Sequence, residues 1–204
     1  KPLIFYTINA ALKSKFLNNI IVSTDDKKIA DIAKIYGIEV DNYRPKKLSS
    51  DYSSTWSVIN YELKRIEKKG KKYDFVMMLQ PTTPFRTSEL IDEACKKVIQ
   101  NPNLDSVVSV VNVGGNHPFR MYYKNKSDIL KPFVDKITDP MLARQLLPPI
   151  FIRSGDIYLT KRECIFEKKS LIGDPSMGIE ISSEKAVNID TQNDFIVAKH
   201  IMKN

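Results

Sequence analysis

The sequence predicts an α/β fold in which a doubly wound, mostly parallel sheet is flanked by helices. Apolar strands alternate with amphipathic helices along the chain, and the strands are short, continuous apolar runs of the kind that are buried on both faces. The length of 204 residues suits one domain with its own core.

Five stretches carry apolar residues at helical spacing. Gly37 is expected to stop the second helix, and Thr87 to cap the fourth. Thr191 and Asp194 predict a capping box for the last. The predicted helices are 3–12, the stretch that carries Ile29 to Tyr36, the stretch that carries Ile59 to Ile66, the stretch after Thr87 that carries Ile91 to Val98, and 191–202.

Three apolar runs predict buried strands: "NIIVSTDD" (19–26), "FVMML" (75–79) and "DSVVSVV" (105–111). The alternation breaks between about residues 112 and 150, where glycines, prolines and aromatic residues gather. We expect this segment to be an insertion that packs elsewhere, as a dimer contact with a second subunit.

The composition excludes several classes of protein. The net charge is +8 and the pI is about 9.3, but no basic and aromatic pattern of a nucleic-acid-binding module accompanies the charge. A lysine-rich solvated surface or a small polyanionic substrate fits the charge instead. No apolar run reaches the ~18 residues of a membrane span. Cys95 and Cys164 have no partner motif, which favours reduced thiols in a cytoplasmic protein.

Polar residues follow the predicted strands, at the sheet edge where ligands of such folds bind. "QPTTPFR" (80–86) ends one strand, and "NID" (188–190) places Asn188 and Asp190 two residues apart. In "RPKKLSSDYSST" (44–55) an arginine precedes hydroxyls at a helix start, which suits phosphate or ribose. Taken singly, Asp190 could be a cap, Gln80 a turn residue and Arg44 a surface ion pair. Their joint order favours a site.

In that order the segments resemble the acylneuraminate cytidylyltransferases, or CMP-nonulosonate synthetases. The resemblance covers most of the chain and includes irregular loops. It implies a Rossmann-like fold and Mg²⁺-dependent transfer of CMP from CTP to a nonulosonic acid, with release of pyrophosphate. The segments that carry it are "KPLIFYTINAALKS", "NIIVSTDDKKIADIAKIYGIEV", "RPKKLSSDYSST", "MMLQPTTPFRT", "DSVVSVV", "NHPF", "RQLLPPIFIRSGDIYLT" and "NIDTQNDF".

The resemblance also implies roles for single residues. Asp190 would be the catalytic metal ligand, with Asn188 beside it. Arg153 is our candidate for the sugar carboxylate, ahead of Arg144. The nucleotide would contact Arg44, Ser53 and Thr55, and the sugar acid would contact Gln80, Thr82, Arg153 and Ser154.

Three departures from the family matter. The family opens with a strand and a Gly- and Lys-containing loop that cradles the triphosphate; we expect residues 1–204 to be a nucleotidyltransferase domain that lacks this segment. Asn188 stands where an aspartate is common, so metal binding would rest on Asp190. Ser154 stands where asparagine is commoner, which suggests a legionaminate- or pseudaminate-type sugar.

Other functions stay open at this stage. The chain could act on an eight-carbon keto acid, or be an inactive nucleotide-binding relative. A glycosyltransferase would use Asp25-Asp26 as a metal motif, although acidic residues at a helix start are favoured without any metal. His117 could be a general base, but a structural role or a subunit contact is the preferred interpretation.

Overall fold

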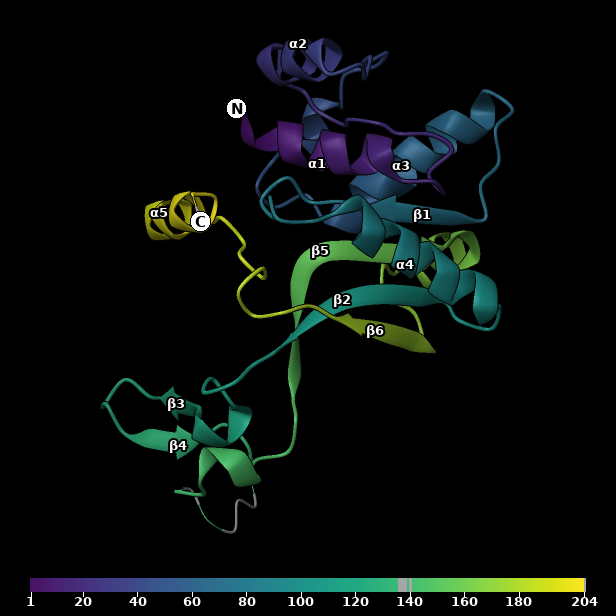
Figure 1. Ribbon diagram of the computed structural model, residues 1–204. Helices are drawn as coiled ribbons and strands as arrows, with labels where there is room; N and C mark the ends of the chain where they lie inside the picture. Colours follow the sequence, from purple (N-terminus) through teal and green to yellow (C-terminus); the bar gives the residue numbers. More distant parts are fainter. Residues whose placement is uncertain (136–138, 140, 204) are drawn as a thin grey trace.

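The structure is a computed structural model that describes residues 1–135, 139 and 141–203; it consists of a body and a projecting arm (Figure 1). The body holds a four-stranded sheet in the order β1-β5-β2-β6. Strand β5 pairs antiparallel with β1 and β2, while β2 and β6 are parallel. Three strands therefore share one direction, and the predicted α/β class with its helix-flanked, mostly parallel sheet is confirmed. The bounds are β1 (Phe75–Met78), β2 (Ser106–Asn112), β5 (Phe151–Lys161) and β6 (Ser176–Glu180).

All five predicted helices are present. Asp26 caps α2 by accepting from the amides of Lys28 and Ile29, so the structural interpretation of the acidic pair is confirmed for this residue. Thr87 caps α4, and Thr191 and Asp194 form the predicted capping box. None of the described helices has the length and hydrophobicity that a bilayer crossing requires. The helices are α1 (Leu3–Lys13), α2 (Lys27–Ile35), α3 (Thr55–Lys68), α4 (Ser88–Gln100) and α5 (Gln192–Ile201).

Most of the buried apolar residues among those the structure describes fall into two separate clusters. The larger packs α1 and α4 against the sheet around the fully buried Ile91, Val107 and Ile157. The smaller joins α1 and α2 through Ile8 and Ala33. Residues of both clusters line a groove of about 1240 Å³, so the core is divided rather than continuous.

The prediction of a strand at 19–26 is wrong. Residues 19–24 are not part of a sheet, although the carbonyl of Thr24 accepts from the amide of Arg44 at 2.8 Å. The physical reason is the groove, which is lined by Ile20, Ile21 and Val22 on one side and by β1 on the other. An apolar run becomes a strand only where a neighbouring strand can satisfy its backbone.

The arm lies within the segment at about 112–150, where the predicted alternation of strands and helices breaks. Strands β3 (Tyr122–Lys124) and β4 (Leu130–Pro132) pair there, away from the main sheet (Figure 1). Residues 136–138 and 140 of this segment lie outside the described residues. His117 is buried at its base, where Nδ1 accepts from the amide of Phe119 and Nε2 contacts the Pro148 carbonyl. Both ring nitrogens are thus used in holding the backbone, as the structural interpretation expected.

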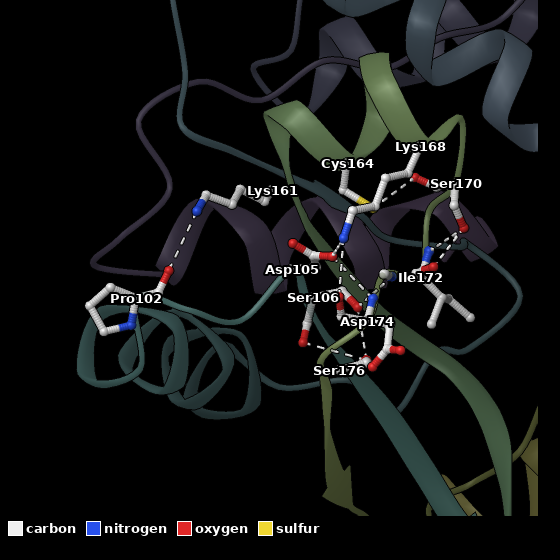
Figure 2. Close-up of polar contacts among 11 residues, drawn as sticks. Pro102, Asp105, Ser106, Lys161, Cys164, Lys168, Ser170, Ile172, Asp174 and Ser176 are labelled. Carbon is white, nitrogen blue, oxygen red and sulfur yellow. Dashed lines mark hydrogen bonds and ion pairs between the residues drawn. The ribbon is translucent and has the colours of Figure 1, made fainter.

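A polar network holds the end of the sheet where β2 begins (Figure 2). The Asp105 carboxylate pairs with Lys168 and accepts from the Asp174 amide at 3.1 Å. Ser106 donates to the Ser176 hydroxyl at 2.8 Å. This network pins the loop before β6 and leaves the opposite end of the sheet for a ligand.

Candidate active site

The candidate site lies at the sheet edge where β1, β2 and β6 end and β5 begins. The turn with Gln80 follows β1 there, and the segment with Asp190 follows β6. The amide of Ile189 donates to the Thr82 carbonyl at 2.9 Å. The Gln80 turn and the 188–190 segment, far apart in sequence, are therefore neighbours in space.

A cavity of about 340 Å³ lies beside the Gln80 turn, and residues 169–172 of the loop before β6 also line it. Three of the predicted site residues line it from three separate segments: Thr55 opens α3, Gln80 follows β1 and Arg153 lies early in β5. The wall thus combines a hydroxyl, an amide and a cation, which suits a polar anionic ligand. The remaining lining residues are Trp56, Met78, Tyr158, Lys169, Ser170, Leu171 and Ile172.

An irregularity in β5 brings Arg153 and Tyr158 to the same cavity. In a regular strand, residues five apart point to opposite faces. Here Val108 pairs with Tyr158 and Val110 with Arg153, so one β2 residue faces four of β5. This extended bulge re-aims the side chains as β-bulges beside functional sites do.

Two buried residues hold the bulge. The hydroxyl of Ser109 accepts from the Ile157 amide and from the Ser154 hydroxyl, both at 2.8 Å. Gly155 supplies a φ of +90°, where a side chain would be strained. Ser154, predicted to contact the sugar, is thus engaged with Ser109 and lines neither of the two cavities; its contact with a ligand stays a prediction.

The other predicted residues do not line the small cavity. Arg44 lines the end of the large groove near Thr24 and Pro81, and its guanidinium lies 3.6 Å from the Asp25 carboxylate. Its Nε is buried and has no acceptor in the described chain. The Ser53 hydroxyl bonds within its own loop, to Ser50 and to the Lys47 carbonyl.

Asn188 and Asp190 face each other. The Asn188 amide nitrogen donates to the Asp190 carboxylate at 2.6 Å. The amide oxygen is buried without a partner among the described residues, while Asp190 is exposed. An oxygen without a donor beside a carboxylate suits a hard cation. No cluster of three or more His, Cys, Asp or Glu in the described residues could hold a metal, so a cation here would need ligands from its substrate or from water.

Comparison with known proteins decides the family. The family model described as cytidylyltransferase matches residues 1–131. The chain belongs to the cytidylyltransferase family. Over all 204 residues it is 31% identical to a CMP-N,N'-diacetyllegionaminic acid synthase of Legionella pneumophila, covering 86% of that protein. It is 27% identical to a pseudaminic acid cytidylyltransferase of Campylobacter jejuni, again with full coverage of this chain and 86% of the relative.

Solved structures agree on the fold of this cytidylyltransferase. A CMP:2-keto-3-deoxy-manno-octonic acid synthetase complexed with CTP superposes with a TM-score of 0.68 and 13% identity, over all of this chain and 89% of the other. A 4-diphosphocytidyl-2C-methyl-D-erythritol synthase of Anaerococcus prevotii gives a TM-score of 0.66, also at 13% identity, over all of this chain and 87% of the other. The sequence matches place the chain among the CMP-nonulosonate synthetases, as the resemblance predicted.

Sequence reasoning missed seven residues that line this cytidylyltransferase's cavity, among them Trp56, Tyr158 and Lys169. Trp56 follows Thr55 at the start of α3 and looks like an ordinary helix residue. Tyr158 lies within an apolar strand, and only the bulge shows which way it faces. The glycine in "RSGDIY" was the one available signal, since an isolated glycine within a strand often marks a bulge.

Proposed function

We propose that this cytidylyltransferase transfers CMP from CTP to the anomeric hydroxyl of a sialic-acid-like nonulosonic acid. The observation that carries the proposal is the convergence of Thr55, Gln80 and Arg153 on one cavity at the ligand-binding edge of the sheet. The names of the relatives support the substrate class, and the match over all 204 residues to a CMP-N,N'-diacetyllegionaminic acid synthase makes a legionaminic-type acid the first candidate to test.

In this reaction the anomeric oxygen forms a bond to the α-phosphorus of CTP. The bond from that phosphorus to the oxygen bridging to the β-phosphate breaks, pyrophosphate leaves, and the hydroxyl proton passes to solvent. Negative charge increases on the leaving oxygens, so cationic groups stabilise the transition state. Arg153 is our candidate to hold the sugar carboxylate by paired hydrogen bonds, with Gln80 and Thr82 beside the sugar.

For the nucleotide we propose Arg44, Ser53 and Thr55. The Arg44 Nε is a buried donor in need of an acceptor, which a nucleotide oxygen would provide. Thr55 is the first residue of the 14-residue helix α3, whose free amides favour an anion. Both features support binding of a charged nucleotide at this edge.

We propose that Mg²⁺ binds at Asp190 with the Asn188 amide oxygen as a neutral second ligand. The partnerless amide oxygen supports this assignment, because a cation would supply the partner that this oxygen lacks. When bound, the ion would neutralise the phosphate oxygens. Asp190 contributes the charge and Asn188 orients the carboxylate through their 2.6 Å hydrogen bond.

The test is pyrophosphate release from CTP and Mg²⁺ by the intact protein, with legionaminic, pseudaminic, sialic and eight-carbon keto acids. We expect turnover on one of the nine-carbon acids. Tight CTP binding without turnover on any acid would favour the inactive relative, and turnover on the eight-carbon acid alone would change the substrate class.

The variant Asp190→Ala tests whether Asp190 is a metal ligand or only a turn residue. We expect loss of turnover with little change in unfolding temperature, because the carboxylate is exposed and outside the capping box. Asp139→Ala, an exposed aspartate in the arm, is the matched control and should keep full turnover. A large loss of stability in Asp190→Ala would favour the turn-residue interpretation instead.

We propose that the arm, within about residues 112–150, mediates a homodimer. Large apolar side chains are exposed there and on the start of β5, which is unusual unless a partner covers them. Sedimentation of the protein should show a dimer, and Leu146→Glu should dissociate it. The exposed side chains are Met121, Tyr122, Tyr123, Ile129, Leu130, Phe133, Met141, Leu146, Phe151 and Ile152.

We propose also that the large groove accepts an extended apolar strand beside β1. The divided core, the unpaired run at 19–24 and the free edge of β1 support this. A chain that supplies such a strand should protect the amides of 19–24 from hydrogen exchange.

Cytoplasmic location is proposed from the two reduced, buried cysteines.

A further inference from the structure

Arg86 is a buried cation outside both cavities. It is 5% exposed, although arginines are seldom buried without a paired acid, and no carboxylate of the described residues lies within ion-pair distance of it. Burial lowers its pKa to about 10, and the nearby Asp156 charge works in the opposite direction. A group held at such cost needs a structural or functional reason.

The hydrogen bonds of Arg86 connect three separate segments. Nε donates to the Asp156 carbonyl in the β5 bulge at 2.6 Å. One terminal nitrogen donates to the Thr7 hydroxyl of α1 at 3.0 Å. The other donates to the Gln80 carbonyl at 2.6 Å and to the Thr83 hydroxyl.

Two of those segments, the turn and the bulge, contribute residues to the lining of the small cavity. Gln80 comes from the turn, and Arg153 and Tyr158 flank the bulge. The Gln80 side chain also lies close to the Gly155 backbone, because a Cβ added to Gly155 would lie 3.0 Å from the Gln80 side-chain oxygen. The Arg86 guanidinium therefore holds the Gln80 turn and the β5 bulge at a fixed distance from each other, although Arg86 does not itself line the cavity.

We propose that Arg86 is a positioning residue that holds the Gln80 turn against the β5 bulge and thereby sets the shape of the sugar-acid pocket. The part that concerns the sugar rests on the proposed function. Asp156 belongs to the same device: it is 1% exposed, and burial raises its pKa. Its carboxylate is the nearby negative charge that partly compensates the buried guanidinium.

Arg86→Lys is the first test, since lysine keeps the charge but cannot reach three segments at once. We expect the KM for the sugar acid to rise about tenfold while the KM for CTP changes less than about twofold. Arg86→Met should lose more. Arg65→Lys and Arg65→Met are the control variants. Arg65 also joins separate segments, through Asp41 and Glu62, and its side chain is 15% exposed, yet it lies on α3 away from the turn.

Hydrogen–deuterium exchange provides a readout that does not need turnover. In Arg86→Lys, peptides covering 80–87 and 153–158 should both exchange faster, while the Arg65 variants should leave them unchanged. The positioning role is refuted if neither peptide exchanges faster in Arg86→Lys. It is also refuted if the KM for the sugar acid and the KM for CTP rise by the same factor, in the Arg86 variants and the Arg65 variants alike. A wild type that turns over no acid would overturn the proposed function, while exchange would still decide the role of Arg86.

Discussion

Removing the Ser109 hydroxyl should release the β5 bulge from β2, because this hydroxyl joins the two strands there. Ser109 is fully buried, and its oxygen is the acceptor for both the Ile157 amide and the Ser154 hydroxyl. In Ser109→Ala these two buried donors lose their partner, and each such loss costs about 1–3 kcal/mol. We expect a total of about 2–4 kcal/mol, since some relaxation follows, which corresponds to a fall in Tm of roughly 5–15 °C for a chain of this length.

Ser106→Ala is the matched control on the same strand. Ser106 is equally buried, and its hydroxyl accepts from the Gly173 amide at 3.0 Å and donates to Ser176, at the opposite end of the sheet from the site. It should lose about 1–3 kcal/mol of stability and keep its KM for the sugar acid. Only Ser109→Ala should also raise that KM, because Arg153 and Tyr158 share the cavity through the bulge.

Thermal unfolding, urea unfolding and steady-state kinetics measure these effects. A loss below about 0.5 kcal/mol in Ser109→Ala would mean that the bulge needs no such anchor. Equal KM values in the two variants would mean that the bulge does not shape the pocket. Either result refutes the reasoning from the β5 geometry.

Three further predictions concern separate parts of the molecule. Trp56 is the one tryptophan and lines the small cavity, so the sugar acid should change intrinsic fluorescence, and a spectrum unmoved at saturation would contradict the site. Burial raises the pKa of Cys164, which is 1% exposed and lines neither cavity, so a disulfide reagent at pH 8 should not label this thiol before unfolding; rapid labelling would show that this part of the core opens. The hydrogen bond from Arg162 lowers the pKa of Glu67 below its ordinary 4.5, so this pair stabilises the fold above that pH and the effect is lost as the pH falls. In Glu67→Gln the free energy of unfolding should fall less steeply as the solution is made acidic. A dependence on pH equal to that of the wild type would exclude this pair as a cause.

Much of the fold could be predicted because its signals are local. Apolar spacing and caps such as Thr87 and Thr191 depend on residues within one or two turns, so the helices follow from the sequence. The run at 19–26 shows the limit of this logic. It has the composition of a strand, but strand formation requires a partner, and the groove separates it from β1.

For the candidate site, too, some features could be predicted from the sequence and others only from the structure. The sequence by itself determined which polar residues follow the strands, and the identity of Gln80, Asn188 and Asp190 as candidates came from that order. The tertiary structure alone decided that Arg153 and Tyr158 share one cavity, because the bulge changes the side-chain alternation by an amount that no local pattern specifies. It alone also showed that Arg86 joins three segments, since hydrogen bonds across 70 to 79 residues depend on how the whole chain folds.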